Sequence, residues 1–146
     1  MSKVIVFDID GTLANIEHRR SFVATKPKNW RAFTAGISND TAHQDIVELT
    51  HLFWNAGHHI ILCSGRGEES RDVTEKQMID FTVPYHQLYM RSAKDHRPDD
   101  IIKVELLQQI RKDWGNPKYW FDDRTRVVNA IRAEGVRVLQ VCAGDF

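Results

Sequence analysis

Asp8 and Asp10 are the residues whose type and spacing point most directly to chemistry. They follow the run Lys3 to Phe7, which is apolar from its second residue on and typical of a buried strand in a parallel sheet. Both carboxylates should leave one face of the chain at the carboxyl end of this strand, where open α/β sheets place their ligands. Like charges this close raise each other's pKa unless a cation lies between them. We therefore predict a Mg²⁺ ion, which prefers oxygen ligands.

The turn Gly11-Thr12 bends the chain away directly after these acids. A solvated loop with a helix cap would account for one of the two aspartates more easily than for both. The run FDIDGTLA resembles DxDGT, the first motif of the haloacid dehalogenase-like (HAD) phosphohydrolase superfamily. This resemblance implies that three further motifs follow in order.

A second polar turn, Ser64-Gly65-Arg66-Gly67, follows the expected strand His58 to Cys63. A hydroxyl at the tip of a strand that leads into a helix N-terminus can hold a phosphate oxygen, and such a strand end resembles the second HAD motif. The run also approaches the dinucleotide pattern GxGxxG. Ser70 replaces the third glycine of that pattern, and the run follows the second strand, so we favour phosphate binding.

Lys103 and the pair Asp122-Asp123 match the other two motifs. Lys103 lies inside an apolar helix for which Pro98 suits the first turn. A lysine in such a place is usually solvated, but the third HAD motif has one near this helix N-terminus that reaches back to the phosphate and the nucleophile. The two aspartates follow the expected strand Lys118 to Phe121 and would complete an oxygen cage for Mg²⁺.

Residues 14–39 differ from the rest of the chain in charge, and we expect them to form a small cap-like insertion. They carry five Lys or Arg against one Glu, in a chain whose 20 basic and 20 acidic residues cancel. Interleaved aromatics suit a ligand with phosphates and bases; the alternative is a flap with packed aromatics and solvated charges. We expect packing for Phe22 and Phe33, and phosphate contact for Arg19 and Arg20.

The remaining patterns predict a single α/β domain over residues 1–146. We expect a HAD-like (Rossmannoid) doubly wound sandwich with a five-stranded parallel sheet and the first strand in its centre. Cys63 and Cys142 should be reduced, buried thiols. No apolar run nears membrane-spanning length, so we expect a cytoplasmic protein. Further strands are expected at 87–90 and 136–141, with helices from about 40 to 56, 68 to 82, 98 to 115 and 124 to 134.

Over nearly its whole length the chain is similar to the 3′-phosphatase domains of bacteriophage polynucleotide kinases. The resemblance rests on FDIDGTLA, CSGR, DHRPDDIIK, FDDRTRVV and GVRVLQVCAGDF. It implies that Arg19 and Arg66 address the substrate phosphate and that Asp95 is a functional acid ahead of Lys103. The expected site residues are Asp8, Asp10, Ser64 and Lys103 for catalysis, Thr12, Arg19, Gly65, Arg66, Asp95 and Arg124 for substrate, and Asp8, Asp10 (through its carbonyl), Asp122 and Asp123 for Mg²⁺.

Together these residues predict a Mg²⁺-dependent phosphomonoesterase that acts through an aspartyl-phosphate on Asp8. A cap of only about 25 residues leaves the site thinly covered, so it would admit a nucleotide or the end of a polynucleotide. We favour the 3′-phosphate of nucleic-acid ends or nucleotides as substrate. A 5′-nucleotidase acting on free (deoxy)nucleoside monophosphates is the close alternative.

A non-catalytic nucleotide-binding module is an alternative of another class, because fold alone does not confer function. The intact set of acids argues against it. No GxxxxGK[ST] run occurs in the sequence, so its residues predict no ATP-dependent phosphorylation. The expected partner is a nucleotide or nucleic-acid end and not a membrane; a homodimer is compatible with so small a cap.

Overall fold

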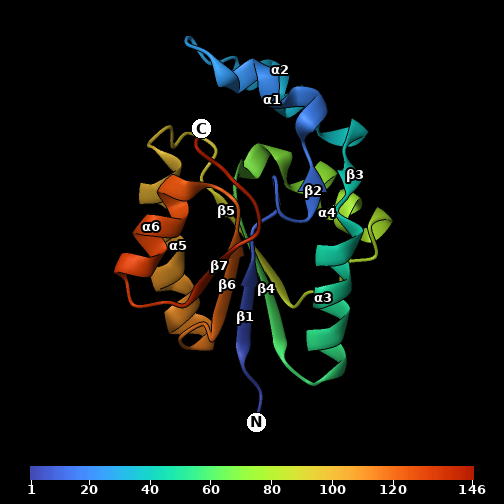
Figure 1. The fold of residues 1–146 in the computed structure, drawn as a ribbon, viewed down its shortest axis with the longest axis vertical. Coiled ribbons are helices and arrows are strands. Elements are labelled where there is room, and N and C mark those ends of the chain that lie inside the picture. Colours follow the sequence, from blue (N-terminus) through green and yellow to red (C-terminus); the bar gives the residue numbers. More distant parts are fainter.

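A parallel sheet runs through the protein, with β1 (Val4–Phe7) in its middle, as the sequence predicts (Figure 1). The computed structural model describes all of residues 1–146. All four β1 residues are buried, because helices cover both faces of the sheet. The strand order is β5-β4-β1-β6-β7, with β4 at His59–Gly67, β5 at Gln87–Arg91, β6 at Tyr119–Asp122 and β7 at Val138–Gln140.

Two helical layers enclose the sheet, each with its own apolar cluster. One face packs against α3 (Gln44–Asn55) and α4 (Arg71–Asp80), which follows a 3₁₀ turn at Glu68–Ser70. The other face packs against α5 (Asp99–Trp114) and α6 (Thr125–Ala133) (Figure 1). Alternate β1 side chains enter the two clusters, which is the period expected of a strand buried on both sides.

A small helical segment leaves and rejoins the fold through a two-stranded hairpin. In this hairpin β2 (Ala14–Asn15) pairs antiparallel with β3 (Thr41–Ala42). Between them lie α1 (Glu17–Ala24), α2 (Trp30–Ala35) and a 3₁₀ turn at Ile37–Asn39. We call residues 14–42 the cap segment; in Figure 1 its helices lie beyond the upper ends of the central strands, at the pole opposite the N-terminus.

The hairpin corrects the predicted start of the helix after the cap segment. That helix was expected from about residue 40, but α3 begins at Gln44 because Thr41 and Ala42 are extended and paired with β2. Phe33 is buried, as expected, whereas Phe22 is 41% exposed, so the packing predicted for Phe22 is wrong.

The two cysteines differ in their surroundings. Cys63 lies in β4 among apolar residues, and burial raises the pKa of its thiol. Cys142 is exposed, so the prediction of a buried thiol is wrong there; the chain after β7 runs over the surface. Neither forms a disulfide. None of the helices combines the length and the apolar character that a membrane crossing demands.

Candidate active site

Three carboxylates meet at the carboxyl ends of two neighbouring strands. Phe7 of β1 is in register with Phe121 of β6, so the residues that follow them, Asp8 and Asp122, lie side by side. Asp123 completes the group, and one oxygen from each carboxylate lies within 4.8 Å of the others. All three residues are buried. The parallel register therefore brings Asp8 of the first motif together with both acids of the fourth motif.

Lys103 reaches this cluster from α5 and is itself buried. Its Nζ donates to Asp8 Oδ1 at 2.6 Å and to Asp122 Oδ2 at 2.9 Å. The hydroxyl of Thr12 donates to the other oxygen of Asp8 at 3.0 Å. Both oxygens of Asp8 are thus held by donors from different parts of the chain, which fixes the orientation of its carboxylate.

The charge of the cluster is not balanced by the protein. Lys103 is the only cation hydrogen-bonded to the three carboxylates, and Arg20 Nη2 lies 3.8 Å from Asp123 Oδ2, so the two cations leave an excess of one negative charge. Burial, together with the charge of Asp122, raises the pKa of Asp8 and raises that of Asp123 to about 6. The buried Oδ2 of Asp123 has no hydrogen-bond partner.

These features fit a Mg²⁺ ion. Carboxylate oxygens are the ligands that Mg²⁺ prefers, and a divalent cation would neutralise the excess charge and occupy the unpartnered oxygen of Asp123. Gly11 makes the approach possible: it has a φ of 84°, and a Cβ on it would overlap the Asp123 carboxylate.

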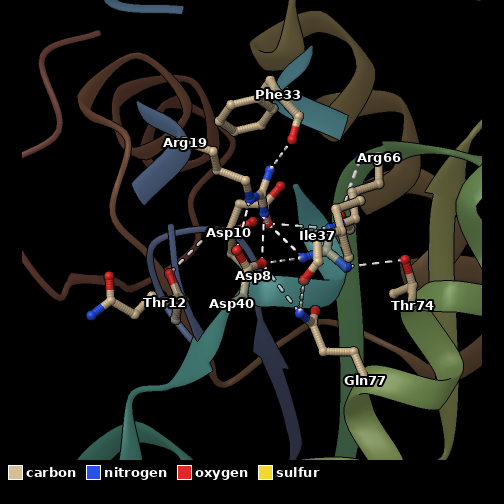
Figure 2. Close-up of polar contacts among 12 residues, drawn as sticks. Asp8, Asp10, Thr12, Arg19, Phe33, Ile37, Asp40, Arg66, Thr74 and Gln77 are labelled. Atoms are coloured by element: carbon tan, nitrogen blue, oxygen red, sulfur yellow. Dashed lines mark hydrogen bonds and ion pairs between the residues drawn. The ribbon is translucent and has the colours of Figure 1, made fainter. Parts of the chain in front are cut away.

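Asp10 faces a different set of partners. Arg19 Nη2 and Arg66 Nη2 each donate to its Oδ1 at 2.7 Å (Figure 2). Burial alone would raise the pKa of Asp10, but Arg66 and Arg19 outweigh it and lower the pKa to about 2. The carboxylate of Asp10 is therefore ionised and bound to arginines, and it is not part of the three-carboxylate cluster.

Asp40, which the sequence analysis missed, balances the two arginines. Its Oδ1 accepts from Arg19 Nε and its Oδ2 from Arg19 Nη2, both at 2.8 Å, while Arg66 Nη2 lies 3.5 Å from Oδ2. Gln77 of α4 also donates to Oδ2, at 3.2 Å (Figure 2). Asp40 immediately precedes β3, so one buried carboxylate joins the end of the cap segment to α1 and to the carboxyl end of β4.

The sequence predicts a turn at Ser64-Gly65-Arg66-Gly67, but these residues form the last part of β4, where the register against β5 shifts between Ser64 and Gly67. Ser64 is buried, and its Oγ accepts from the backbone N–H of Arg66 at 3.1 Å. A Cβ on Gly65 would overlap the carboxylate of Asp99, the first residue of α5. Gly65 therefore lets α5 begin close to the active-site strands.

Asp99 is a second acid that sequence reasoning missed. Its carboxylate lies 3.2 Å from Arg91 Nη2 and 3.6 Å from Arg124 Nη1. Asp95, the acid singled out from the sequence, lies at the rim and pairs with exposed Arg97 at 2.7 Å. The run Arg-Pro-Asp-Asp was the available signal, because Pro98 marks the helix start and places the following acid in its first turn.

One cavity of about 380 Å³ contains both charge clusters. Arg20 is not among the residues that line it; this side chain pairs with Glu17, lies 3.8 Å from Asp123 Oδ2 and covers the ring of Phe146. The lining residues from the sequence analysis are Asp8, Asp10, Arg19, Gly65, Arg66, Asp95, Lys103, Asp122, Asp123 and Arg124, while Thr12 and Ser64 lie behind them.

The family follows from a comparison with known domains. A model of the polynucleotide kinase PNKP phosphatase domain matches residues 2–146. The chain belongs to this family. It is thus a HAD phosphatase domain of the PNKP type, and the match covers both charge clusters and the cap segment.

Two solved structures are similar to the whole chain. One is described as a Pnkp1/Rnl/Hen1 complex: a chain in it is 29% identical, with a TM-score of 0.82, and the match covers 100% of this chain and 48% of that one. The other, the Pnkp1/Rnl/Hen1 RNA repair complex, has a chain 28% identical with a TM-score of 0.84, covered to 44%. This chain therefore spans about half the length of those relatives.

A third structure shows the fold alone. It is a hydrolase from Streptococcus pneumoniae TIGR4, 15% identical, with a TM-score of 0.67; the match covers 98% of this chain and 95% of that one. Its likeness supports the HAD-like arrangement of sheet and helices.

The metal site can be tested by thermal unfolding of the Asp123→Asn variant at pH 7.5. Because the folded-state pKa of Asp123 is raised to about 6, its ionised form destabilises the metal-free fold above that pH. We expect the metal-free variant to have a melting temperature several degrees above that of metal-free wild type, which corresponds to a gain of about 1 kcal/mol or more in the free energy of unfolding. Wild type should gain stability on Mg²⁺ addition, by about 2.7 kcal/mol at a hundred times Kd, and the variant should not.

Asp80→Asn is the matched control, since Asp80 is an exposed acid at the end of α4. It should keep the full Mg²⁺-dependent gain. An equal gain in Asp123→Asn and wild type would contradict the metal site.

The buried ion-pair network can be tested with Asp40→Asn. The network contains two carboxylates, Asp10 and Asp40, so this change leaves Arg19 and Arg66 with Asp10 alone. Loss of one partner of a buried ion pair costs about 3–5 kcal/mol of stability. We expect this loss in the free energy of unfolding, measured by denaturant titration. Glu48→Gln, at an exposed acid of α3, should change it by less than about 0.5 kcal/mol; equal effects of the two changes would refute the network's role.

Proposed function

We propose that this chain is a Mg²⁺-dependent phosphomonoesterase that removes the 3′-phosphate from nucleic-acid ends or nucleotides through an aspartyl-phosphate on Asp8. The observation that supports it most is the position of Asp8: its carboxylate lines the cavity, held between Lys103 and Thr12 beside two further acids. Membership of a phosphatase family supports the reaction class.

In this mechanism Asp8 is the nucleophile. One of its oxygens attacks phosphorus in line, the bond to the leaving oxygen breaks, and an aspartyl-phosphate forms, which divides one difficult displacement into two easier ones. Lys103 favours the ionised form of Asp8 against the effect of burial and orients its carboxylate, because its ammonium is hydrogen-bonded to that carboxylate. Water then attacks the aspartyl-phosphate, which releases inorganic phosphate and restores Asp8.

Asp10 moves the protons of both steps. It donates a proton to the leaving oxygen and later accepts one from the attacking water. Arg19 and Arg66 hold its carboxylate ionised with a pKa of about 2. When these arginines bind the phosphate oxygens of a substrate, they no longer offset the effect of burial, so the pKa of Asp10 rises toward the value that a general acid needs.

The remaining residues bind the phosphoryl group and the metal. Bound Mg²⁺ supplies Lewis-acid neutralisation of the phosphate charge. Its proposed ligands are Asp8, Asp122 and Asp123 with the Asp10 carbonyl. We assign the binding of phosphoryl oxygens to Lys103, which lines the cavity, and to Ser64 behind it, with Arg19, Gly65, Arg66 and Arg124 as further contacts. The cap segment covers the cavity.

The choice of substrate rests on the relatives and on the shape of the site. Chains similar to this one were solved in an RNA repair complex, which favours a nucleic-acid end. The volume of the cavity is in the range typical of small-molecule sites, and a single phosphate group would not fill it. A substrate with a nucleotide behind its phosphate would use that space.

The proposal is tested by Mg²⁺-dependent phosphate release from three substrates. These are a 3′-phosphorylated oligonucleotide, nucleoside 3′-monophosphates and nucleoside 5′-monophosphates. We expect the 3′-phosphates to be preferred, and Asp8→Asn to lower the rate by at least about a thousandfold, because the amide cannot act as the nucleophile. Asp80→Asn serves as the control and should keep full activity.

Two outcomes would contradict this assignment. Full activity of Asp8→Asn would exclude Asp8 as the nucleophile. A preference for 5′-monophosphates would make the protein a nucleotidase of the free nucleotide pool.

A further inference from the structure

The active-site cavity extends beyond the catalytic residues to the cap segment. Trp30, the first residue of α2, lines it, and so does Lys28 in the loop before that helix. The residues proposed to bind and cleave the phosphate line the same cavity. A substrate whose phosphate lies at Asp8 can therefore extend toward Trp30.

Trp30 is half exposed although it carries the largest apolar side chain of the cap segment. Its ring is 48% exposed, and Phe33 packs against it edge-on with the ring centroids 5.5 Å apart. Phe33 is buried and also stacks with Arg19, so it gives the indole a fixed support. A supported ring that remains open to a cavity is a surface on which another flat group can stack.

The other tryptophans have partners away from the cavity. Trp54 stacks on His86 with a centroid distance of 4.4 Å, Trp114 donates to Gln87 at 2.8 Å, and Trp120 is buried in the core. Trp54 is nearly as exposed as Trp30, at 41%, but Trp30 is the only tryptophan that lines the active-site cavity.

Positive charge accompanies this ring. Lys28 Nζ lies 5.5 Å from the centroid of Trp30 and forms no salt bridge. Lys28 of the cap segment lines the same cavity as Arg124 and as Arg126 of α6, so their charges lie near one another. Burial and the cations Arg124, Lys26 and Arg126 accordingly lower the pKa of Lys28. Such a group of cations attracts a phosphate backbone.

We propose that Trp30 is a base-stacking platform and that Lys28 binds a backbone phosphate, so that together they hold the nucleotides preceding the phosphate that is removed. This inference rests on the proposed function and adds that the substrate is a single-stranded nucleic-acid end. Every base has a π face, so the platform tolerates any sequence. The platform would favour a nucleic-acid end over a small phosphomonoester, because only the nucleic acid has a base to stack on Trp30.

The test compares kcat/KM for a single-stranded 3′-phosphorylated oligonucleotide with that for the same oligonucleotide carrying abasic sites at its last two positions. Loss of one stacked base should lower the value by about tenfold to a hundredfold. We expect Trp30→Ala to cause this loss with the normal oligonucleotide and a much smaller one with the abasic oligonucleotide. Trp30→Phe should lose less, because it keeps a π face, and Trp54→Ala is the matched control.

Binding can be measured separately from turnover in the Asp8→Asn background. The oligonucleotide should quench tryptophan fluorescence, and the quench should disappear with Trp30→Phe but remain with Trp54→Phe. Lys28→Gln should reduce the slope of log(kcat/KM) against log(salt) by about 0.7, the value for one contact with single-stranded nucleic acid. Lys118→Gln, at an exposed lysine before β6, should leave that slope unchanged.

The outcomes separate this inference from the proposed function. If wild type releases no phosphate from the oligonucleotide, the proposed function fails and the platform with it. If wild type cleaves the oligonucleotide but Trp30→Ala and Trp54→Ala behave alike, the platform alone is overturned. Equal losses by Trp30→Ala on the normal and abasic oligonucleotides would also overturn it, because the effect would not depend on the bases.

Discussion

A single buried ammonium group holds the catalytic end of this fold together. Lys103 extends from α5 to Asp8 after β1 and to Asp122 at the end of β6. Removing a charge from water is costly unless it is paired and hydrogen-bonded, so this lysine is stable only where both carboxylates meet it. The same contact fixes the two acids against each other although their charges repel. The packing of α5 on the sheet and the position of Asp8, the proposed nucleophile, therefore depend on the same contact.

A second charged network joins the cap segment to this centre. Arg19 comes from α1, Asp40 from the end of the cap segment, and Arg66 from the carboxyl end of β4, yet all three are linked to Asp10 or to each other by ion pairs. The position of the cap segment therefore affects the residue proposed as acid and base. A phosphate that attracts the two arginines would act on Asp10 and on the cap segment together.

The sequence was sufficient for the parts of the site that regular structure positions. Asp8 and Asp122 could be placed because parallel strands end at the same edge of a sheet. Lys103 was assigned to the site only through the resemblance to the third HAD motif, because a lysine in a helix is usually solvated. Asp40 could not be placed, because its partners depend on how residues 14–42 fold back through the β2–β3 hairpin. The exposure of Phe22 was missed for a different reason, because α1 is too short for a periodic pattern to mark its buried face.

The most direct test of the account is to find the phosphate on the enzyme. Wild type is mixed with ³²P-labelled 3′-phosphorylated oligonucleotide, quenched in acid within one turnover, and digested for peptide mapping. The account predicts an acid-stable, alkali-labile phosphate on the peptide that carries Asp8. Turnover with no labelled protein under conditions that trap acyl phosphates, or label on any other residue, would contradict it.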